Sequence, residues 1–261
     1  MLGSGKDPTR VKSARRALDL IDLIAASGSM SFQEIVDTRL PKSSAHGLLS
    51  TLVESGWLER SATRRYTLGL RAWQVGQTYD GHRLLLEVAD PILDRVVTEL
   101  GETVQLARLD GIESVYIAIR LSPHPMRLAS AVGMRLHAHA TGIGKALLST
   151  LEPAEARRRL ESVVLPRLTD HTTTDVSQLM NRLDRAREVG FAVDDEEFIE
   201  GCRCVAVPIT TEQETGIVSA LSVTMPTQRT NHRWPHSLYP ALRDAAVDIR
   251  RGMGLHGSLS P

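Results

Sequence analysis

The 261-residue sequence lacks several features that would identify a secreted or membrane-embedded protein. It has only two cysteines, Cys202 and Cys204, which are too few and too close in sequence to form a disulfide framework. No apolar run approaches the roughly 18 residues of a membrane span, and the N-terminus lacks the apolar core of a signal peptide. We therefore expect a globular protein of the cytoplasm with no membrane partner.

Net charge is also lacking, because 31 Lys and Arg balance 31 Asp and Glu. The distribution is uneven, however. Residues 1–71 hold 11 basic against 7 acidic residues, a net charge of +4, and residues 72–261 hold 20 against 24, a net charge of −4. A basic N-terminal part beside an acidic remainder is expected when one end of a chain contacts nucleic acid. The length allows two domains, each with its own core.

Two helices are predicted in the first 38 residues. Ser13 is placed to cap the first helix, and the second begins at Phe32, because Ser31 to Glu34 have the S-x-x-E pattern of a capping box. The apolar face expected for the first helix comprises Ala14, Ala17, Leu18, Ile21, Ile24 and Ala25. The second helix is short and ends near Thr38.

The stretch LPKSSAHGLLSTLVESG, residues 40–56, predicts a third helix. Pro41 suits its first turn and Gly56 its C-terminal stop. Its apolar face is made of Ala45, Leu48, Leu49, Leu52 and Val53. The opposite face carries small hydroxyl residues, His46 and Gly47, where an ordinary surface helix carries Glu, Lys and Arg. An ordinary amphipathic helix with weakly polar surface residues is the alternative.

Residues 57–69, WLERSATRRYTLG, predict a β-hairpin with a turn at residues 61–63. Arg60, Arg64 and Arg65 cluster at its tip. A short helix, a tight turn, a third helix and then a basic hairpin form a winged helix-turn-helix. The hairpin arginines can contact phosphates or enter the minor groove, although a solvated hairpin tip alone would look the same.

These features together predict binding to double-stranded DNA. Short Ser and Thr side chains let a helix lie deep in the major groove, and the N-terminus of the third helix suits a phosphate. The residues expected to contact DNA are Arg15, Ser31, Gln33, Lys42, Ser43, Ser44, His46, Gly47, Ser50, Arg64 and Arg65.

Residues 71–100 are again helical in pattern and are expected to connect the DNA-binding part to a second domain. Pro91 is expected to kink the second helical piece or to restart it. Such a connection is a natural dimer contact, because winged modules usually bind paired half-sites.

The remainder has the pattern of an α+β domain. Two strands meet at Asp110–Gly111, a hairpin signal, and residues 126–140 continue as extended chain. Strands are also expected at residues 202–210 and 216–226, and helices at residues 141–151, 172–190 and 237–253. Strands in hairpins between helices predict an antiparallel sheet with helices packed on it.

Three stretches could carry chemistry. The loop at residues 139–146, HATGIGKA, offers backbone N–H groups for an anion, or is simply a glycine-rich helix start. The acidic run at residues 194–197, DDEE, is expected to be a solvated loop, with a metal site or an acid pair as alternatives. His137 and His139 could form a zinc site with Cys202 and Cys204 if the fold brought them together.

Many segments resemble, in the same order, the IclR-type transcriptional regulators. In the N-terminal part these are SARRALDLIDLIA (13–25), LPKSSAHGLLSTLVESGWLER (40–60) and RRYTLGLRA (64–72). In the C-terminal part they include GETVQLARLDGIESVYI (101–117), HATGIGKALL (139–148) and REVGFAVDDEEFIEGCRCVAVPI (187–209). The resemblance covers about residues 11–254. It implies a GAF-like effector-binding domain and dimers or dimers of dimers.

The resemblance also implies a site for a small organic or aromatic acid. Carried over, its residues are Gly142, Ile143, Asp194, Cys204, Ser222 and Thr224. The sequence departs from the family pattern at Gly47, where Arg is common, at Ile143, where smaller residues are common, and at Thr224, where Ser is frequent. The first departure removes a DNA contact, and the other two change the size of the effector site.

The expected organisation is therefore an N-terminal tail (1–10), a winged helix-turn-helix domain (11–70), linker helices (71–100), a GAF-like effector-binding and oligomerisation domain (101–254) and a C-terminal tail (255–261). The expected function is that of a repressor of a catabolic or metabolic operon, with an activator as the alternative. No cofactor, metal or catalytic residue is expected. Rival hypotheses are a hydrolase that uses Cys204 or a metal, and a sensor that no longer binds DNA.

Overall fold

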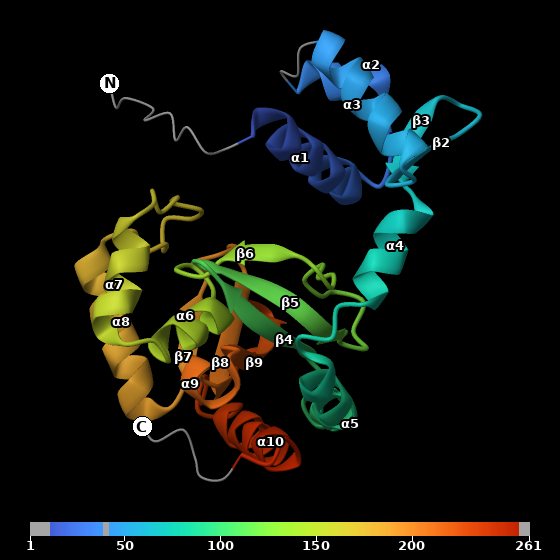
Figure 1. Cartoon of the computed structure of the whole chain (residues 1–261). Coiled ribbons are helices and arrows are strands. Elements are labelled where there is room, and N and C mark those ends of the chain that lie inside the picture. The colour runs from blue at the N-terminus through green and yellow to red at the C-terminus, as the bar shows by residue number, and fades with distance from the viewer. Residues whose placement is uncertain (1–10, 39–41, 256–261) are drawn as a thin grey trace. The chain divides into compact units, whose positions relative to one another are not determined.

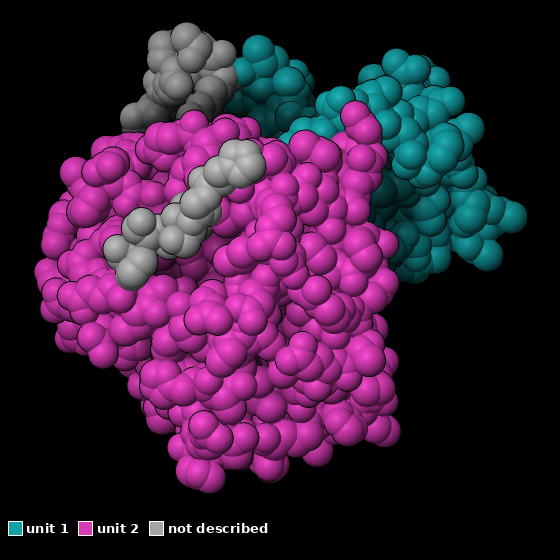
Figure 2. Space-filling view, turned by 90° about the horizontal axis from the view of Figure 1, so that it is seen from below, with its two compact units in different colours: residues 1–81 teal, residues 82–261 magenta. Residues whose placement is uncertain are grey.

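The computed structural model describes residues 11–38 and 42–255, except for the side chain of Ser43. The chain forms two compact units, Met1–Gly81 and His82–Pro261, which are coloured separately in Figure 2. The division falls inside the predicted connection at residues 71–100. Pro41, residues 1–10 and all of the predicted C-terminal tail except Leu255 lie outside the described residues.

Three helices surround the core of the first unit. They are α1 (Lys12–Ser27), α2 (Phe32–Asp37) and α3 (Lys42–Glu54). The buried core comprises Leu20, Ile24, Met30, Ile35, Ala45, Leu49, Leu52, Leu58 and Tyr66. Leu48 and Val53 pack against this core as partly buried residues, so the predicted apolar face of the third helix is confirmed.

The start and the buried face of α1 differ from the prediction. Val11 is the N-cap residue and makes no side-chain cap bond, so Ser13 lies within the first helical turn and does not cap it. Leu20 and Ile24, four residues apart, form the buried stripe, whereas Leu18 is exposed. The predicted face is therefore confirmed for Ile24, with Ala17 and Ile21 packed against the core, and wrong for the exposed Ala14, Leu18 and Ala25.

The predicted hairpin is formed by β2 (Leu58–Arg60) and β3 (Arg65–Leu68), which pair antiparallel. A third strand, β1 (Met30–Ser31), pairs with the other edge of β3, giving the order β1-β3-β2. A two-residue strand has too few residues to show an alternating pattern, and it was not predicted. Helix α4 (Leu70–Gln77) follows the hairpin and has no buried residue.

The second unit contains a six-stranded sheet of order β6-β5-β4-β9-β8-β7, in which every neighbouring pair is antiparallel. The strands are β4 (Thr103–Asp110), β5 (Glu113–Arg120), β6 (Arg135–His137), β7 (Ala192–Asp195), β8 (Cys202–Thr210) and β9 (Ser219–Pro226). The predicted turn between β4 and β5 is confirmed, with Gly111 at φ +62°. The extended chain expected at residues 126–140 forms only the three-residue β6.

Helices cover both faces of this sheet (Figure 1). Helices α5 (Arg83–Leu100) and α10 (Tyr239–Gly252) pack on one face around Leu93, Val205 and Leu242. Helices α6 (Gly142–Ser149), α7 (Pro153–Glu161) and α8 (Val176–Val189) pack on the other face around Leu147, Leu160 and Leu183. We call the latter the α6 face. The short helices α9 (Glu212–Thr215) and η1 (Thr227–Arg229) complete the unit.

Helix α5, predicted as part of a connection, belongs to the core of the second unit. Its buried residues Leu85, Ala89, Leu93 and Val96 share one face and pack against the sheet. Pro91 lies inside the helix and does not restart it. None of the helices in the described ranges has the length and apolarity needed to cross a membrane.

Candidate DNA interface and effector site

Local hydrogen bonds fix the start of α2. The N–H of Ser31 donates to Glu34 Oε2 at 2.6 Å, and Ser31 Oγ accepts the N–H of Glu34 at 3.3 Å, so the predicted capping box is confirmed. These bonds, led by the one from the Ser31 backbone, lower the pKa of Glu34. The Ser31 hydroxyl, one of the predicted DNA contacts, thus already has a structural role. Gln33, another of them, bonds Asp37 Oδ1 at 2.8 Å.

The outer face of α3 is open to solvent. Lys42, His46, Gly47 and Ser50 are exposed, and Ser44 is half-buried. Apart from its two chain neighbours and the backbone of its own helix turn, no described residue lies within 4 Å of a Cβ added at Gly47, so this position leaves room for close approach of a partner. The side chain of Ser43, also a predicted contact, lies outside the described part.

Two contacts fix the approach of α3 to its neighbours. Arg16 Nη1 on α1 donates to Ser44 Oγ at 3.5 Å, and the rings of Phe32 and His46 meet edge to face with centroids 6.4 Å apart. Arg15 is exposed and lies 4.0 Å from Asp19, a surface pair that water screens strongly. Arg15 is therefore accessible to a partner, as the prediction requires.

The two predicted wing arginines have different surroundings. Arg64 is exposed at the hairpin turn, with a left-handed backbone at φ +59°. Arg65 is half-buried: its Nε donates to Ser29 Oγ at 3.0 Å and its Nη2 to Ser29 O at 2.9 Å. Arg65 also pairs with Glu34 at 3.1 Å. Arg65 therefore ties the hairpin to α2, while Arg64 faces solvent.

The six residues assigned to an effector site by resemblance lie together on the α6 face, around Cys204. In the sheet register Cys204 is opposite Asp194 on β7 and Thr224 on β9. Thr224, Ser222 and the backbone of Ile143 lie near its sulfur and act on its pKa. A Cβ added at Gly142 would lie 3.0 Å from Cys204 Sγ, so glycine allows the start of α6 to approach the sheet.

Burial controls the ionisation of this cluster. Burial raises the pKa of Cys204 to about 12, helped by the charge of Asp194 and opposed by the nearby polar groups of Thr224, Ser222 and the Ile143 backbone. Burial also raises the pKa of Asp194 to about 6, against the opposing charge of Lys145. The thiol is therefore protonated near neutral pH, and Asp194 titrates in a range accessible to experiment.

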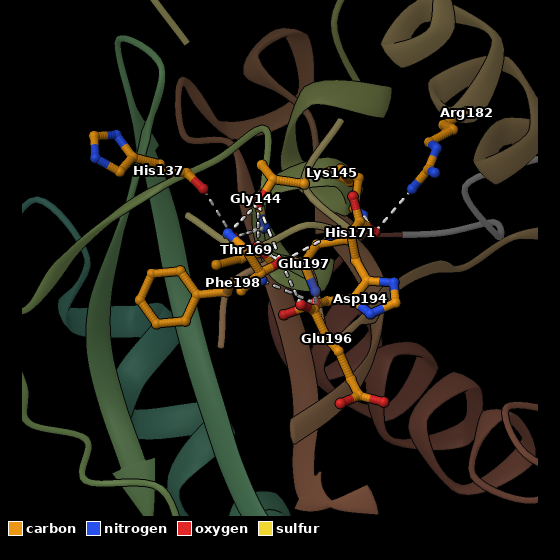
Figure 3. A network of polar contacts seen from close by, with 12 residues as sticks. His137, Gly144, Lys145, Thr169, His171, Arg182, Asp194, Glu196, Glu197 and Phe198 are labelled. Carbon is orange, nitrogen blue, oxygen red and sulfur yellow. Dashed lines mark hydrogen bonds and ion pairs between the residues drawn. The ribbon is translucent and has the colours of Figure 1, made fainter. Parts of the chain in front are cut away.

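Asp194 also organises the loop that follows β7. Its Oδ1 accepts the N–H groups of Glu197 at 2.8 Å and Phe198 at 3.3 Å. The buried Glu197 carboxylate pairs with Lys145 of α6 and, at 2.9 Å, with Arg182 of α8, as Figure 3 shows. The expectation of a solvated acidic loop is thus wrong for Asp194 and Glu197, because both are buried, and holds for the exposed Asp195.

Two residues of this face were not predicted. Gln105 of β4 lies opposite Ser222 in the sheet register, and its Oε1 accepts hydrogen bonds from Ser222 at 3.0 Å and Thr224 at 3.2 Å. Tyr116 of β5 is buried, and its pKa is raised by that burial and by the charges of Cys204 and Asp194. The alternation of Gln105 with Val104 and Leu106 is the signal that could have placed Gln105 on this face.

The residues on which the rival hydrolase hypothesis rests have other surroundings than it requires. Among residues 11–38 and 42–255, no three His, Cys, Asp or Glu side chains are grouped as metal ligands. His139 Nε2 instead meets Pro166 O at 3.0 Å. A catalytic cysteine needs a lowered pKa, whereas burial raises that of Cys204.

Comparisons with known proteins agree with this architecture. Residues 13–62 match the IclR helix-turn-helix domain, and residues 77–251 match the bacterial transcriptional regulator IclR C-terminal domain. The chain is 33% identical over 250 residues to the HTH-type transcriptional regulator BhcR of Paracoccus denitrificans, covering 95% of this chain and 89% of the relative. It is 33% identical to the HTH-type transcriptional repressor AllR of Salmonella typhi, covering 95% of this chain and 93% of that one.

A solved structure has the same fold along nearly the whole chain. It is an IclR homologue from Microbacterium hydrocarbonoxydans in complex with 4-hydroxybenzoate, with a TM-score of 0.79, 28% sequence identity, and coverage of 93% of this chain and 99% of that one. Both domains of the family are present here, with the helix-turn-helix domain first in the chain. The chain therefore belongs to the IclR family of DNA-binding transcriptional regulators.

Proposed function

We propose that this regulator represses a catabolic or metabolic operon and that a small organic or aromatic acid modulates its binding to the operator. The observation that carries the effector part is a set of buried polar side chains on the α6 face: Asp194, Ser222 and Thr224 are each less than 10% exposed. These three side chains have protein partners, but the buried Nε2 of the neighbouring Gln105 has no hydrogen-bond partner among the described residues, and buried donors are normally paired. The complex of a relative with 4-hydroxybenzoate supports an acid as the partner.

Operator binding is assigned to α3 and the hairpin. Lys42, His46 and Ser50 are exposed on α3 and can reach bases or phosphates in the major groove. The exposed Arg64 can reach the flanking backbone. The relatives named as repressors favour repression, and a reporter fused to the target promoter separates repression from activation.

A homodimer, with a dimer of dimers as its higher assembly, is proposed to form through the first unit. Val11 and Leu18 of the α1 region are 65% and 63% exposed, and Leu70 and Trp73 of α4 are 60% and 62% exposed. Large exposed apolar residues on α1 and on α4, which has no buried residue, indicate an interaction surface. A two-fold dimer then presents two α3 helices to the half-sites of a pseudo-palindromic operator in the cytoplasm.

Effector control follows from linkage. The acid shifts operator affinity only by its differential affinity for the DNA-bound and free forms of the dimer. The experiment measures operator affinity by fluorescence anisotropy with and without 4-hydroxybenzoate, benzoate, lactate and propionate. We expect at least one acid to change the affinity by about 5- to 150-fold, the usual range of such coupling. Unchanged affinity with all four would contradict the effector part and leave the DNA part standing.

A further inference from the structure

Gln105 is a fully buried carboxamide on the face that carries the proposed effector site. It lies on β4 between β5 and β9, with Ile119 and Ser222 as register partners, and is 0% exposed. Its neighbours Val104 and Leu106 point to the opposite face and pack in the core formed with α5 and α10. Gln105 therefore stands among Ser222, Thr224 and Cys204.

The two ends of this carboxamide differ. Oε1 accepts two hydrogen bonds, from Ser222 Oγ at 3.0 Å and Thr224 Oγ1 at 3.2 Å. Nε2 is buried and has no hydrogen-bond partner among the described residues. A glutamine NH2 group carries two donors, and leaving a buried donor unpaired is costly enough to be rare in native proteins. This NH2 group, held in place at its other end, therefore needs an acceptor that the described residues do not supply.

We propose that Gln105 Nε2 binds a carboxylate oxygen of the effector, which makes Gln105 a specificity-determining residue. The inference rests on the proposed function and adds a ligand group that the family resemblance did not assign. Only an acceptor satisfies an NH2 group. Ser222 and Thr224 each donate their hydroxyl proton to Oε1 and so do not compete for the carboxylate.

The surrounding charges restrict the acid to a single negative charge. Lys145, whose charge reaches Asp194, is already paired with Glu197, and Arg182 pairs with the same carboxylate. Asp194 adds a negative charge above its pKa. Lys145 and Arg182 carry two positive charges against the single carboxylate of Glu197, so one positive charge is left to balance a ligand when Asp194 is protonated. Buried charge without an opposite partner is strongly unfavourable, so a monocarboxylate fits this face better than a dicarboxylate or a phosphate.

The hydroxyls of Ser222 and Thr224 add a second preference. Having donated to Gln105, each retains lone pairs that accept a hydrogen bond. Both lie within 3.2 Å of the carboxamide, so a ligand donor must sit next to the ligand carboxylate. A 2-hydroxy monocarboxylic acid meets both requirements: its carboxylate accepts from Nε2, and its hydroxyl donates to Ser222 or Thr224.

The test measures acid binding to the full chain by isothermal titration calorimetry with two matched pairs, lactate against propionate and salicylate against benzoate. We expect the hydroxy acid of each pair to bind more tightly. We expect Gln105→Met to weaken binding by about 10- to 100-fold, the effect of one hydrogen bond to a charged group. Gln105→Glu still accepts from Ser222 and Thr224 but replaces the donor with an acceptor, so it should abolish binding.

Ser219→Ala is the control, because Ser219 is also buried on β9 but bonds Thr210 at 2.7 Å, away from the cluster. It should bind acids as the wild type does. Wild-type affinity in both Gln105 variants, or no binding of any of the four acids to the wild type, would overturn the inference. Acid binding that leaves operator affinity unchanged would instead contradict the proposed function and spare the role of Gln105.

Discussion

Lys145 of α6 and Glu197 of the loop after β7 form an ion pair in which the side chains are 3% and 2% exposed. The pair joins helix α6, whose first residue Gly142 has no room for a Cβ beside Cys204, to the loop that Asp194 caps. Removing one partner of a buried pair leaves an uncompensated charge. The position of the α6 N-terminus beside the sheet therefore depends on this contact.

Glu197→Gln should lower the free energy of unfolding by about 3–5 kcal/mol, because Lys145 and Arg182 lose their carboxylate. The measurement is denaturant unfolding of the full chain. Asp195→Asn is the matched control: it removes an exposed pair with Arg203 at 2.6 Å, and such surface pairs contribute at most about 1 kcal/mol. If both variants lost the same free energy of unfolding, the buried Glu197 pair would stabilise the fold no more than the exposed Asp195 pair does.

The pKa of Asp194, raised by burial from 3.8 to about 6, predicts a pH dependence of stability. The folded chain favours the protonated carboxyl of Asp194. The stabilisation of the fold that results is fully present below about pH 4 and is lost as the pH rises through about 6. Relative to Asp194→Asn, whose amide oxygen can accept the same N–H bonds, the wild type should lose about 3 kcal/mol between these limits. If the stabilities of the wild type and Asp194→Asn changed in parallel from pH 4 to pH 7.5, the raised pKa of Asp194 would be refuted.

The wing arginines provide a matched pair of substitutions. Arg64→Ala should leave stability unchanged and reduce the dependence of log affinity on log salt by about 1 per protomer, because one phosphate contact is lost. Arg65→Ala removes the bonds to Ser29 and Glu34 and should cost about 1 kcal/mol of stability. Anisotropy titrations at several salt concentrations and thermal unfolding separate the two effects. A wild-type salt slope in the Arg64 variant would show that the β2–β3 hairpin does not contact DNA phosphates.

Gly47 should tolerate a side chain, because space is open around it. Gly47→Ala is expected to stabilise the exposed helix by about 1 kcal/mol without changing operator affinity. Gly47→Arg should tighten DNA binding by about 1 kcal/mol or more through a new contact in the groove. Weaker binding by both variants would indicate that DNA packs directly against the Gly47 backbone.

Periodicity predicted the parts of the fold that short-range patterns control. The face of Ala45, Leu49 and Leu52 and the turn at Gly111 follow from spacing and turn chemistry alone. The burial of Asp194 and Glu197 could not be predicted in this way, since four adjacent acids look solvated until Lys145 and Arg182 approach from other helices. The role of Leu20 was missed because the phase of a helix depends on its tertiary neighbours.

The residues of the proposed effector site also differ in whether a local sequence pattern could place them. The glycine-rich start of α6 is visible as a local motif, whereas Ser222 and Thr224 join Cys204 only through the pairing of β8 with β9. The partnership of Gln105 with Ser222 spans 117 positions of the chain, and a single sequence contains no local signal for it.

The most direct test of the account is a titration of DNA from the region upstream of the protein's own gene, with and without a saturating concentration of whichever tested acid binds most tightly. The account predicts binding about 10³-fold or more tighter than to random DNA of equal length, and a change in that affinity when the acid is added. Equal affinity for both DNAs, or an operator affinity that the bound acid leaves unaltered, would contradict it.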